Sequence, residues 1–273
     1  MEVNGFKTKA SALRAIREAG FQISGLLAQP ESNPKVAKNG KIGVMTAPLH
    51  LAPASLSGFN VCAQASAGCI AACLHTAGNP VYMTQKTASR VAKTKAYFHV
   101  RKAFVALLAF EIAALERKAI KAGMQAGIRL NATSDIPWEA VALEVDGIQH
   151  ANLMALFPLV EFYDYTKITK RALKFATGKL PANYYLTFSK TEANDSDVMR
   201  VLEAGGNVAM VFDSASYKRV LQDKFAFSFP AIDGDEHDFR PVDPRGVVVA
   251  LKAKGDAKQD ASGFVVRFNG GNA

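Results

Sequence analysis

The pattern that decides the fold is clearest in residues 184–212, YYLTFSKTEANDSDVMRVLEAGGNVAMVF. The two ends of this stretch, 184–188 and 208–212, are short runs rich in Val, Phe and Tyr, as is typical of strands in a buried parallel sheet. Between them, the spacing of the apolar residues predicts a helix over 194–204. We therefore expect a strand–helix–strand unit with a right-handed crossover.

Strand-like and helix-like segments alternate along most of the 273 residues. Further strands are predicted at 42–46, 128–131, 160–163 and 247–251, and further helices at 7–19, 84–122, 138–155, 167–177 and 215–222. Six strand–helix units predict an α/β fold, namely a partial (β/α)6 TIM-like barrel with parallel strands and a short N-terminal helical extension. A doubly wound sheet is the alternative. We expect residues 1–40 to form the N-terminal helix and linker, and residues 41–273 the barrel domain.

The composition excludes several classes of protein. Hydrophobic residues make up 49% of the chain and charged residues 21%, which is too apolar for a disordered chain. No run approaches the roughly 18–20 apolar residues that span a bilayer, and the start, MEVNGFKTKASALRAIREAG, lacks the layout of a secretory signal. We therefore expect a cytoplasmic protein with no membrane partner. Its net charge of +9 favours an anionic partner without selecting one.

Three cysteines, Cys62, Cys69 and Cys73, lie in one loop that we place at residues 60–76. An odd number of cysteines without a secretory signal argues against a disulfide framework. Three thiolates at the spacing C-x6-C-x3-C indicate a metal site. A [4Fe–4S] cluster on three cysteines leaves one iron open to a substrate or cofactor, whereas zinc needs a fourth ligand, for which His75 is nearest. The remaining alternative is structural packing of small residues in an Ala/Gly-rich segment.

Polar side chains gather directly after the predicted strands, at the edge where α/β folds bind ligands. The residues singled out there are Asn131, Thr133, Ser134, Asp135, Asp164, Lys167, Ser189 and Asp213. Some polar residues are expected at this edge in any case, because they cap the helices that follow. Ser189 and Asp213 fit such caps as well as they fit ligand contacts.

Asp135, Trp138 and Asp164, near this edge, also have two interpretations each. Asp135 fits a general base or ligand contact, or alternatively a helix cap. Trp138 fits a stacking surface for a flat ring, or alternatively a core residue. Asp164 fits an acid–base or nucleophilic role, or alternatively an ion pair with Lys167.

Basic residues recur along the helix predicted at 84–122. Lys86, Arg90, Lys93 and Arg101 follow helical spacing, with Tyr97 in the same stripe. Such a stripe fits a face that tracks the phosphates of a nucleic acid beside an aromatic platform, or alternatively a solvated helix face. No helix-turn-helix, RNA-recognition signature, Walker loop or G-x-G-x-x-G motif accompanies it.

A metal-binding cysteine loop directly after the first strand of a six-unit β/α series resembles the radical-SAM superfamily. The resemblance covers residues from about 42 to 255, and it implies a [4Fe–4S] cluster on the three cysteines whose open iron binds S-adenosylmethionine. The cofactor-binding candidates are then Asn131, Thr133, Ser134, Ser189 and Asp213, and the catalytic candidates are Asp135, Asp164 and Lys167.

The sequence also departs from the radical-SAM pattern. The superfamily usually has the spacing C-x3-C-x2-C rather than C-x6-C-x3-C. The segment Asn131-Ala-Thr-Ser-Asp135 stands where a Gly-Gly-Glu segment often follows the second strand. Ala72 stands where an aromatic residue often precedes the last cysteine. These departures affect the expected S-adenosylmethionine site more than the expected cluster.

Several stretches of the chain are also similar to a family of phage-encoded proteins. They are the cysteine loop, Arg129-Leu-Asn-Ala-Thr-Ser-Asp-Ile-Pro-Trp-Glu139, Phe162-Tyr-Asp-Tyr-Thr-Lys167, Asn183-Tyr-Tyr-Leu-Thr-Phe-Ser189, Asp243-Pro-Arg-Gly246 and Leu251-Lys-Ala-Lys-Gly255. This similarity implies no particular activity. It implies a location in the host cytoplasm.

Together these patterns predict an iron–sulfur, radical-SAM-like enzyme that acts on a small molecule, a nucleotide or a nucleic acid. One alternative is a zinc-containing base-exchange enzyme that modifies nucleic acid, with Asp135 and Asp164 as acid–base or nucleophile and the basic helix holding phosphates. The other alternative is a non-enzymatic phage protein that binds a host partner and uses the metal to order its loop.

Overall fold

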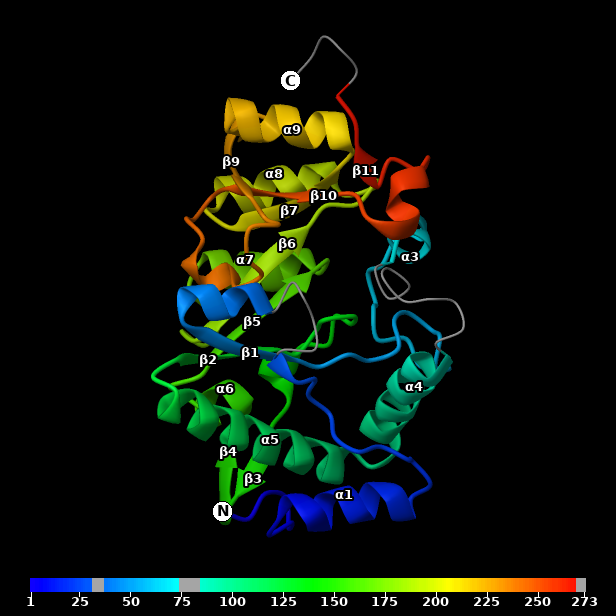
Figure 1. The fold of residues 1–273 in the computed structure, drawn as a ribbon, viewed down its shortest axis with the longest axis vertical. Coiled ribbons are helices and arrows are strands. Elements are labelled where there is room, and N and C mark those ends of the chain that lie inside the picture. Colours follow the sequence, from blue (N-terminus) through cyan, green and yellow to red (C-terminus); the bar gives the residue numbers. More distant parts are fainter. Residues whose placement is uncertain (31–36, 74–83, 269–273) are drawn as a thin grey trace. The chain divides into compact units, whose positions relative to one another are not determined.

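The computed structural model describes residues 1–30, 37–73 and 84–268 (Figure 1). The chain forms two compact units, and each unit draws on segments that are far apart in the sequence. Unit 1 comprises Met1–Ala63, Tyr82–Tyr163 and Pro181–Tyr184, and unit 2 comprises Gln64–Val81, Asp164–Leu180 and Tyr185–Ala273. The expected division of the chain at residue 40 stays a prediction.

Unit 1 is built on three strands, β1 (Val44–Pro48), β2 (Gln125–Arg129) and the start of β5 (Glu161–Thr166). The strands are parallel and neighbour one another in chain order, with Val44 opposite Gln125 and Gly127 opposite Glu161. Every residue of β1 is buried, so this strand is covered on both faces, as expected in a parallel sheet.

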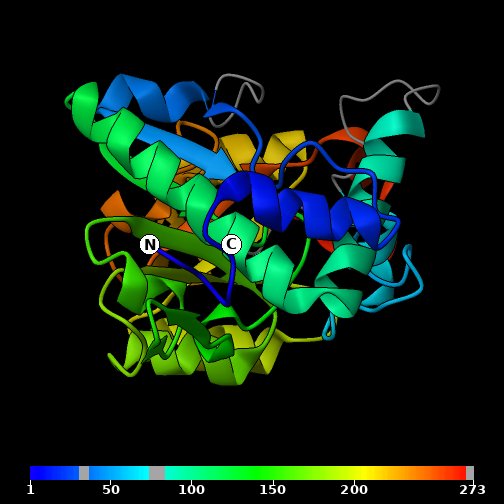
Figure 2. The same ribbon diagram turned by 90° about the horizontal axis from the view of Figure 1, so that it is seen from below.

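Two helices of unit 1 pack against each other, as Figure 2 shows for α1 in dark blue and α5 in green. Helix α1 (Lys9–Glu18) begins with a capping box in which the Thr8 hydroxyl accepts from the Ser11 amide. Helix α5 (Arg101–Lys121) also packs on β1 and β2, and most of its apolar side chains are buried. The helix predicted at 7–19 is therefore confirmed.

The single helix predicted over 84–122 is wrong, because the chain forms α4 (Thr84–His99) and α5 with a break at Val100. Val100 leaves the helical region with φ −131° and ψ 49°. Its amide still donates to Ala96, and its carbonyl accepts from Phe104, so Val100 ends one helix and begins the next. Tyr97 packs edge-to-face on Phe104 across the break, with ring centroids 5.5 Å apart.

The helix predicted at 138–155 is also wrong, because the middle of this segment forms a hairpin of β3 (Leu143–Val145) and β4 (Ile148–His150). Asp146 and Gly147 both have positive φ angles, 49° and 81°, which is the conformation of a tight two-residue hairpin turn. The N-terminal residues extend this hairpin, since Val3 bridges to Val145 and the Asn4 amide donates to Glu144. In Figure 1 the N-terminus accordingly lies beside β3 and β4.

Unit 2 is built on a second series of strands, in the order β6-β7-β10-β9-β8, with β11 also paired to β7. The pairs are parallel except for the hairpin of β8 and β9. Their bounds are β6 (Tyr184–Ser189), β7 (Asn207–Phe212), β8 (Phe225–Ala226), β9 (Phe229–Asp233), β10 (Val248–Lys252) and β11 (Val265–Val266).

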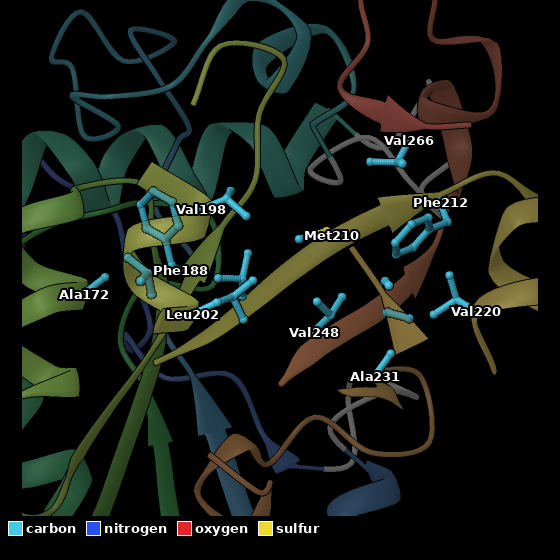
Figure 3. Close-up of a cluster of buried hydrophobic side chains, with 14 residues drawn as sticks. Ala172, Phe188, Val198, Leu202, Met210, Phe212, Val220, Ala231, Val248 and Val266 are labelled. Atoms are coloured by element: carbon cyan, nitrogen blue, oxygen red, sulfur yellow. The ribbon is translucent and has the colours of Figure 1, made fainter. Parts of the chain in front are cut away.

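Three helices complete the core of unit 2: α7 (Thr169–Ala176), α8 (Asp195–Glu203) and α9 (Ser214–Asp223). Figure 3 shows how their apolar side chains meet those of the strands. The centre of this core consists of Phe188, Val208, Met210, Phe212, Val220 and Val248, all fully buried. The helices predicted at 167–177, 194–204 and 215–222 are therefore confirmed.

Six shorter helices complete the described parts of the chain. They are α3 (Ala67–Ala71), α6 (Leu153–Leu156) and four single 3₁₀ turns at Lys38–Ile42, Trp138–Ala140, Arg240–Val242 and Gly255–Gln259. None of the helices in the described ranges is long and apolar enough to cross a membrane.

All six predicted strands are present, and the α/β class with a mostly parallel sheet is confirmed. In unit 1 the parallel strands neighbour one another in chain order, whereas in unit 2 β10 lies between β7 and β9. The doubly wound alternative stays a prediction. In the described parts of the chain no strand pairing closes a barrel. The partial (β/α)6 barrel stays a prediction.

Candidate functional site

Cys62 ends a turn of unit 1 that lies against the segment following β2. Its sulfur is half-buried and lies 3.3 Å from the Ala54 amide nitrogen, which donates to it, and 3.8 Å from the Thr133 carbonyl oxygen. The Cys62 amide donates in turn to the Asn60 side chain at 2.8 Å. These contacts position the Cys62 sulfur within unit 1.

Asn131 organises the turn that follows β2. Its side-chain oxygen, Oδ1, accepts from the Ser134 hydroxyl at 2.8 Å, from the Ile136 amide at 2.9 Å and from the Trp138 ring nitrogen at 3.2 Å. Its side-chain nitrogen, Nδ2, donates to the Ile136 carbonyl at 2.9 Å. Asn131 and Ser134, both predicted to bind a cofactor, are buried and hold this turn, and their contact with a cofactor stays a prediction.

The same turn touches the chain on the N-terminal side of Cys62. The Thr133 hydroxyl donates to the Leu51 carbonyl at 2.6 Å, and the Asp135 amide donates to the Val61 carbonyl at 2.7 Å. Thr133 and Asp135 are therefore brought next to Cys62 within unit 1, as the sequence predicts for residues at the ends of β1 and β2. The catalytic role of Asp135 and the cofactor role of Thr133 stay predictions.

Trp138 is a core residue and offers no stacking surface. It is fully buried, and its ring packs edge-to-face against Tyr97 with the centroids 5.3 Å apart. The interpretation of Trp138 as a platform for a flat ligand is therefore wrong. The reason is that its ring nitrogen belongs to the Asn131 network, which draws the side chain into unit 1.

Cys69 and Cys73 lie in unit 2, on and just after the short helix α3, and both are half-buried. Ser66 caps this helix, since its hydroxyl accepts from the Cys69 amide at 3.2 Å. The Ser66 hydroxyl in turn donates to Glu192 at 2.7 Å, and the other Glu192 oxygen accepts from the Gly68 amide at 2.8 Å. One carboxylate therefore fixes the start of the cysteine helix.

Glu192 stands at the carboxyl end of β6, where the sequence predicts functional residues, but the sequence alone assigned it no role. Burial raises the pKa of its carboxyl group, yet the hydrogen bonds from Ser66 and Gly68 outweigh this and hold the pKa below its usual value. Glu192 is therefore ionised near neutral pH, the state in which it accepts both hydrogen bonds. Its position after a strand was the only signal for it in the sequence.

Close packing also fixes α3. A Cβ atom at Gly68 would lie 2.9 Å from both a Glu192 oxygen and the Cβ of Phe264, and closer still to the Ser262 hydroxyl. Ala72 packs with the apolar side chains that line the other side of this contact, Ala253, Ala257 and Val265. The cysteine helix thus has one position in unit 2, held by a carboxylate, by a glycine and by an apolar contact.

Of three residues predicted to follow strands, only Lys167 does so, because β5 and β6 extend further than predicted and include Asp164 and Ser189. Asp164 is fully buried near the end of β5, and Lys167 is half-buried directly after that strand. The Ser189 carbonyl at the end of β6 accepts from the Asn194 side chain. Their catalytic or cofactor-binding roles stay predictions.

Asp213 caps α9, since its carboxylate accepts from the Ser216 amide at 2.7 Å. Arg267 lies 4.0 Å from the same carboxylate. Burial raises the pKa of Asp213, but the hydrogen bonds from Ser216 and the attraction of Arg267 outweigh it and hold the pKa below its usual value. The capping interpretation of Asp213 is confirmed, and its contact with a cofactor stays a prediction.

The Asp213→Asn variant is expected to lower stability at neutral pH but not in acid. Asparagine still caps the helix, so the change removes only the charge. Because the folded-state pKa is depressed, the charge stabilises the fold above the unfolded value of about 3.9 and this contribution is lost as the pH falls through the folded value. Urea unfolding at pH 7, 4 and 3 measures the free energy of unfolding of variant and wild type. A difference between the two proteins that is the same at all three pH values would contradict the prediction.

The four basic residues do not form one stripe, because the helix break places Arg101 on α5. Arg101 donates to the Tyr97 hydroxyl at 2.7 Å and lies over the Tyr97 ring. Lys93 donates to the Leu26 carbonyl at 2.8 Å, which turns it towards the body of unit 1. Lys86 is exposed and Arg90 is half-buried on α4. A continuous phosphate-binding face from these residues is therefore wrong, and a nucleic-acid partner stays a prediction.

In residues 1–30, 37–73 and 84–268, no group of three or more His, Cys, Asp or Glu side chains is arranged to hold a metal ion. His75, the predicted fourth zinc ligand, lies outside the described residues. What the structure does bring together is Cys62 with the turn after β2 in unit 1, and Cys69 with the Glu192 anchor in unit 2.

Comparison with known proteins identifies a family. The Gene product 88 family matches residues 25–267, which is most of the chain. No curated protein and no solved structure matches, so the comparisons lend no support to the radical-SAM resemblance. The matched residues include the three cysteines, Glu192 and the turn after β2. The chain belongs to the Gene product 88 family, a phage-type family.

Proposed function

We propose that this protein is an iron–sulfur, radical-SAM-like enzyme in which Cys62, Cys69 and Cys73 hold a [4Fe–4S] cluster. The observation that carries the proposal is the anchoring of α3 by Glu192, which makes no use of the cysteine side chains themselves. A charged residue thus holds in place the short helix that carries Cys69 and leads to Cys73. Metal-binding ligands are commonly oriented by such outer hydrogen bonds.

The donor set suits this cluster. Thiolates are the ligands of iron–sulfur clusters, and three of them would leave one iron open to S-adenosylmethionine. When bound, the cluster would supply the electron for the reductive cleavage of S-adenosylmethionine. The residues of the chain would bind and orient the substrate: Thr133 and Asp135 stand beside Cys62, and the net charge of +9 suits a nucleotide or other anionic substrate.

Anaerobic reconstitution with iron and sulfide tests the proposal. We expect about four iron and four sulfide per chain, and a reduced cluster visible by electron paramagnetic resonance. Serine in place of Cys62, Cys69 or Cys73 is expected to lower the iron content. Ala71→Ser is the matched control, because it changes an exposed residue on the same helix and keeps every sulfur. Circular dichroism of each variant separates loss of the cluster from loss of the fold.

Two other outcomes would replace this proposal. Stoichiometric zinc without sulfide would favour the zinc-containing base-exchange enzyme, with Asp135 and Asp164 in the acid–base or nucleophile roles. A folded protein that binds neither metal would favour the non-enzymatic protein with a host partner. With a cluster in place, formation of 5′-deoxyadenosine from S-adenosylmethionine under reduction tests the enzymatic step, and its absence would contradict that step alone.

A further inference from the structure

A pocket in unit 1 lies between the start of α5 and the hairpin of β3 and β4, and it has no role in the function proposed above. Its volume is about 440 Å³, which lies within the range of small-molecule sites. A turn near the N-terminus, the first residues of α5 and the hairpin line it, and none of the three cysteines does. Figure 1 shows the hairpin beside α5, with the N-terminus next to it.

The turn near the N-terminus fixes the walls of the pocket before any ligand binds. Asn4 and Gly5 both have positive φ angles, 48° and 85°, and the residues on either side of them exchange two backbone hydrogen bonds, as in a tight two-residue turn. The Asn4 side chain reaches the other two walls. Its Oδ1 accepts from the Glu144 amide at 2.9 Å, and its Nδ2 donates to the Lys102 carbonyl at 3.2 Å. One residue therefore ties together the turn, the hairpin and the start of α5.

Two cations, Arg101 and Lys102, line the pocket without a carboxylate partner. The Arg101 guanidinium donates to the Tyr97 hydroxyl at 2.7 Å, which uses only one of its several N–H groups and holds the side chain in one position. Within the described ranges, the Lys102 ammonium group has no partner, and Arg101 has no carboxylate at ion-pair distance. Both side chains are exposed, so a ligand in the pocket can reach them.

One carboxylate, that of Glu144, lines the same pocket. It accepts from the Gln149 side chain at 3.1 Å, and in the part of the chain that the structure describes it forms no ion pair. A negative group and two positive groups thus line one pocket without pairing with one another. A phosphate would be attracted by the two cations but repelled by Glu144. A ligand that carries carboxylates together with an ammonium group complements all three side chains.

We propose that this pocket binds an acidic α-amino acid, with its two carboxylates held by Arg101 and Lys102 and its ammonium group held by Glu144. A planar guanidinium matches a carboxylate with two parallel hydrogen bonds. The single net negative charge of such a ligand at neutral pH equals the charge that remains when Glu144 offsets one of the two cations. Its methylene groups would contact Val105 and Leu143, two buried apolar residues that also line the pocket. The site does not depend on the cluster.

Titration calorimetry of the full chain with L-glutamate tests this proposal. Glutarate lacks the ammonium group, and 4-aminobutyrate lacks the α-carboxylate. We expect L-glutamate to bind at least about tenfold more tightly than either, because only L-glutamate uses all three charged side chains. Glutarate binding as tightly would overturn the role of Glu144, and 4-aminobutyrate binding as tightly would overturn the pairing with two cations. The absence of binding by both L-glutamate and L-aspartate at millimolar concentration would overturn the whole proposal.

Variants locate the site. Lys102→Gln changes an exposed side chain, so we expect it to weaken L-glutamate binding at least about tenfold while leaving the fold intact. Lys121→Gln is the matched control, because this exposed lysine stands at the other end of α5 and does not line the pocket. Equal weakening by the two variants would show general attraction to a basic surface and overturn the proposal.

Glu144→Gln separates contact with the ligand from a structural role. We expect it to weaken L-glutamate at least about tenfold, because the ammonium group loses its charged partner. Glutarate should bind to this variant as tightly as to the wild type or more tightly, because the repulsion of its carboxylates is removed. Equal weakening of both ligands would show that Glu144 only holds the pocket in shape, and would overturn its role in binding the ammonium group.

Discussion

The Gly68→Ala variant is expected to lose most of its iron after reconstitution, because the added methyl group has no space beside α3. It would lie 2.9 Å or less from atoms of Ser262, Glu192 and Phe264, and the Phe264 Cβ atom is attached directly to the backbone. Relief requires a shift of α3, which carries Cys69 and leads to Cys73. Such overpacking costs about 1–3 kcal/mol, so we also expect the thermal midpoint to fall by several degrees.

Iron and sulfide analysis together with thermal unfolding measures this result. Gly40→Ala is the matched control, because a Cβ atom at Gly40 meets nothing within 4 Å. That variant should bind iron and unfold as the wild type does. A Gly68→Ala protein with the full iron content would show that the position of α3 does not matter for the cluster.

The Asn131→Ala variant is expected to destabilise unit 1 by about 3 kcal/mol or more. Asn131 is 2% exposed, and its removal takes hydrogen-bond partners from the Ser134 hydroxyl, the Ile136 backbone and the Trp138 ring nitrogen. A buried polar group that loses its partner costs about 1–3 kcal/mol, and several lose theirs at once. Urea unfolding followed by Trp138 fluorescence reports on this turn, because Trp138 is the only tryptophan.

Trp138→Phe provides a graded comparison for the same network. It removes the ring nitrogen but keeps most of the buried aromatic surface, so we expect a loss of only about 1–2 kcal/mol. Its unfolding is followed by circular dichroism. If Asn131→Ala cost no more than Trp138→Phe, the network around Asn131 would not be what holds the turn after β2.

The sequence was a good guide to the strands and a poor one to two helical stretches. Buried parallel strands appear as continuous apolar runs, so all six were found. The break at Val100 has no proline or glycine to mark it, and it depends on aromatic packing that the sequence does not display. The hairpin was missed for a different reason. The turn signal Asp146-Gly147 is present in the sequence, but the apolar residues on both sides of it were interpreted as one face of a helix.

The candidate site divides along similar lines. The grouping of cysteines in one loop is visible in the sequence, and so is the run of polar residues after β2. A polar residue at a strand end has the same appearance whether it binds a ligand or holds a turn, so the network of Asn131 could not be foreseen. The partners of Glu192 stand more than a hundred positions earlier in the chain, at Ser66 and Gly68, and only the folded chain brings them together.

The division of each unit among distant segments has a consequence for synthesis on the ribosome. Unit 1 needs nothing beyond Tyr184, whereas unit 2 takes β7, β10 and most of its core from Tyr185–Ala273. At about 5–20 residues per second, translation of that last part lasts on the order of ten seconds. During this interval α7 and the cysteine helix have emerged without the strands that cover them. Expression yield should therefore depend on chaperones and on temperature through the late-forming unit rather than through the early one.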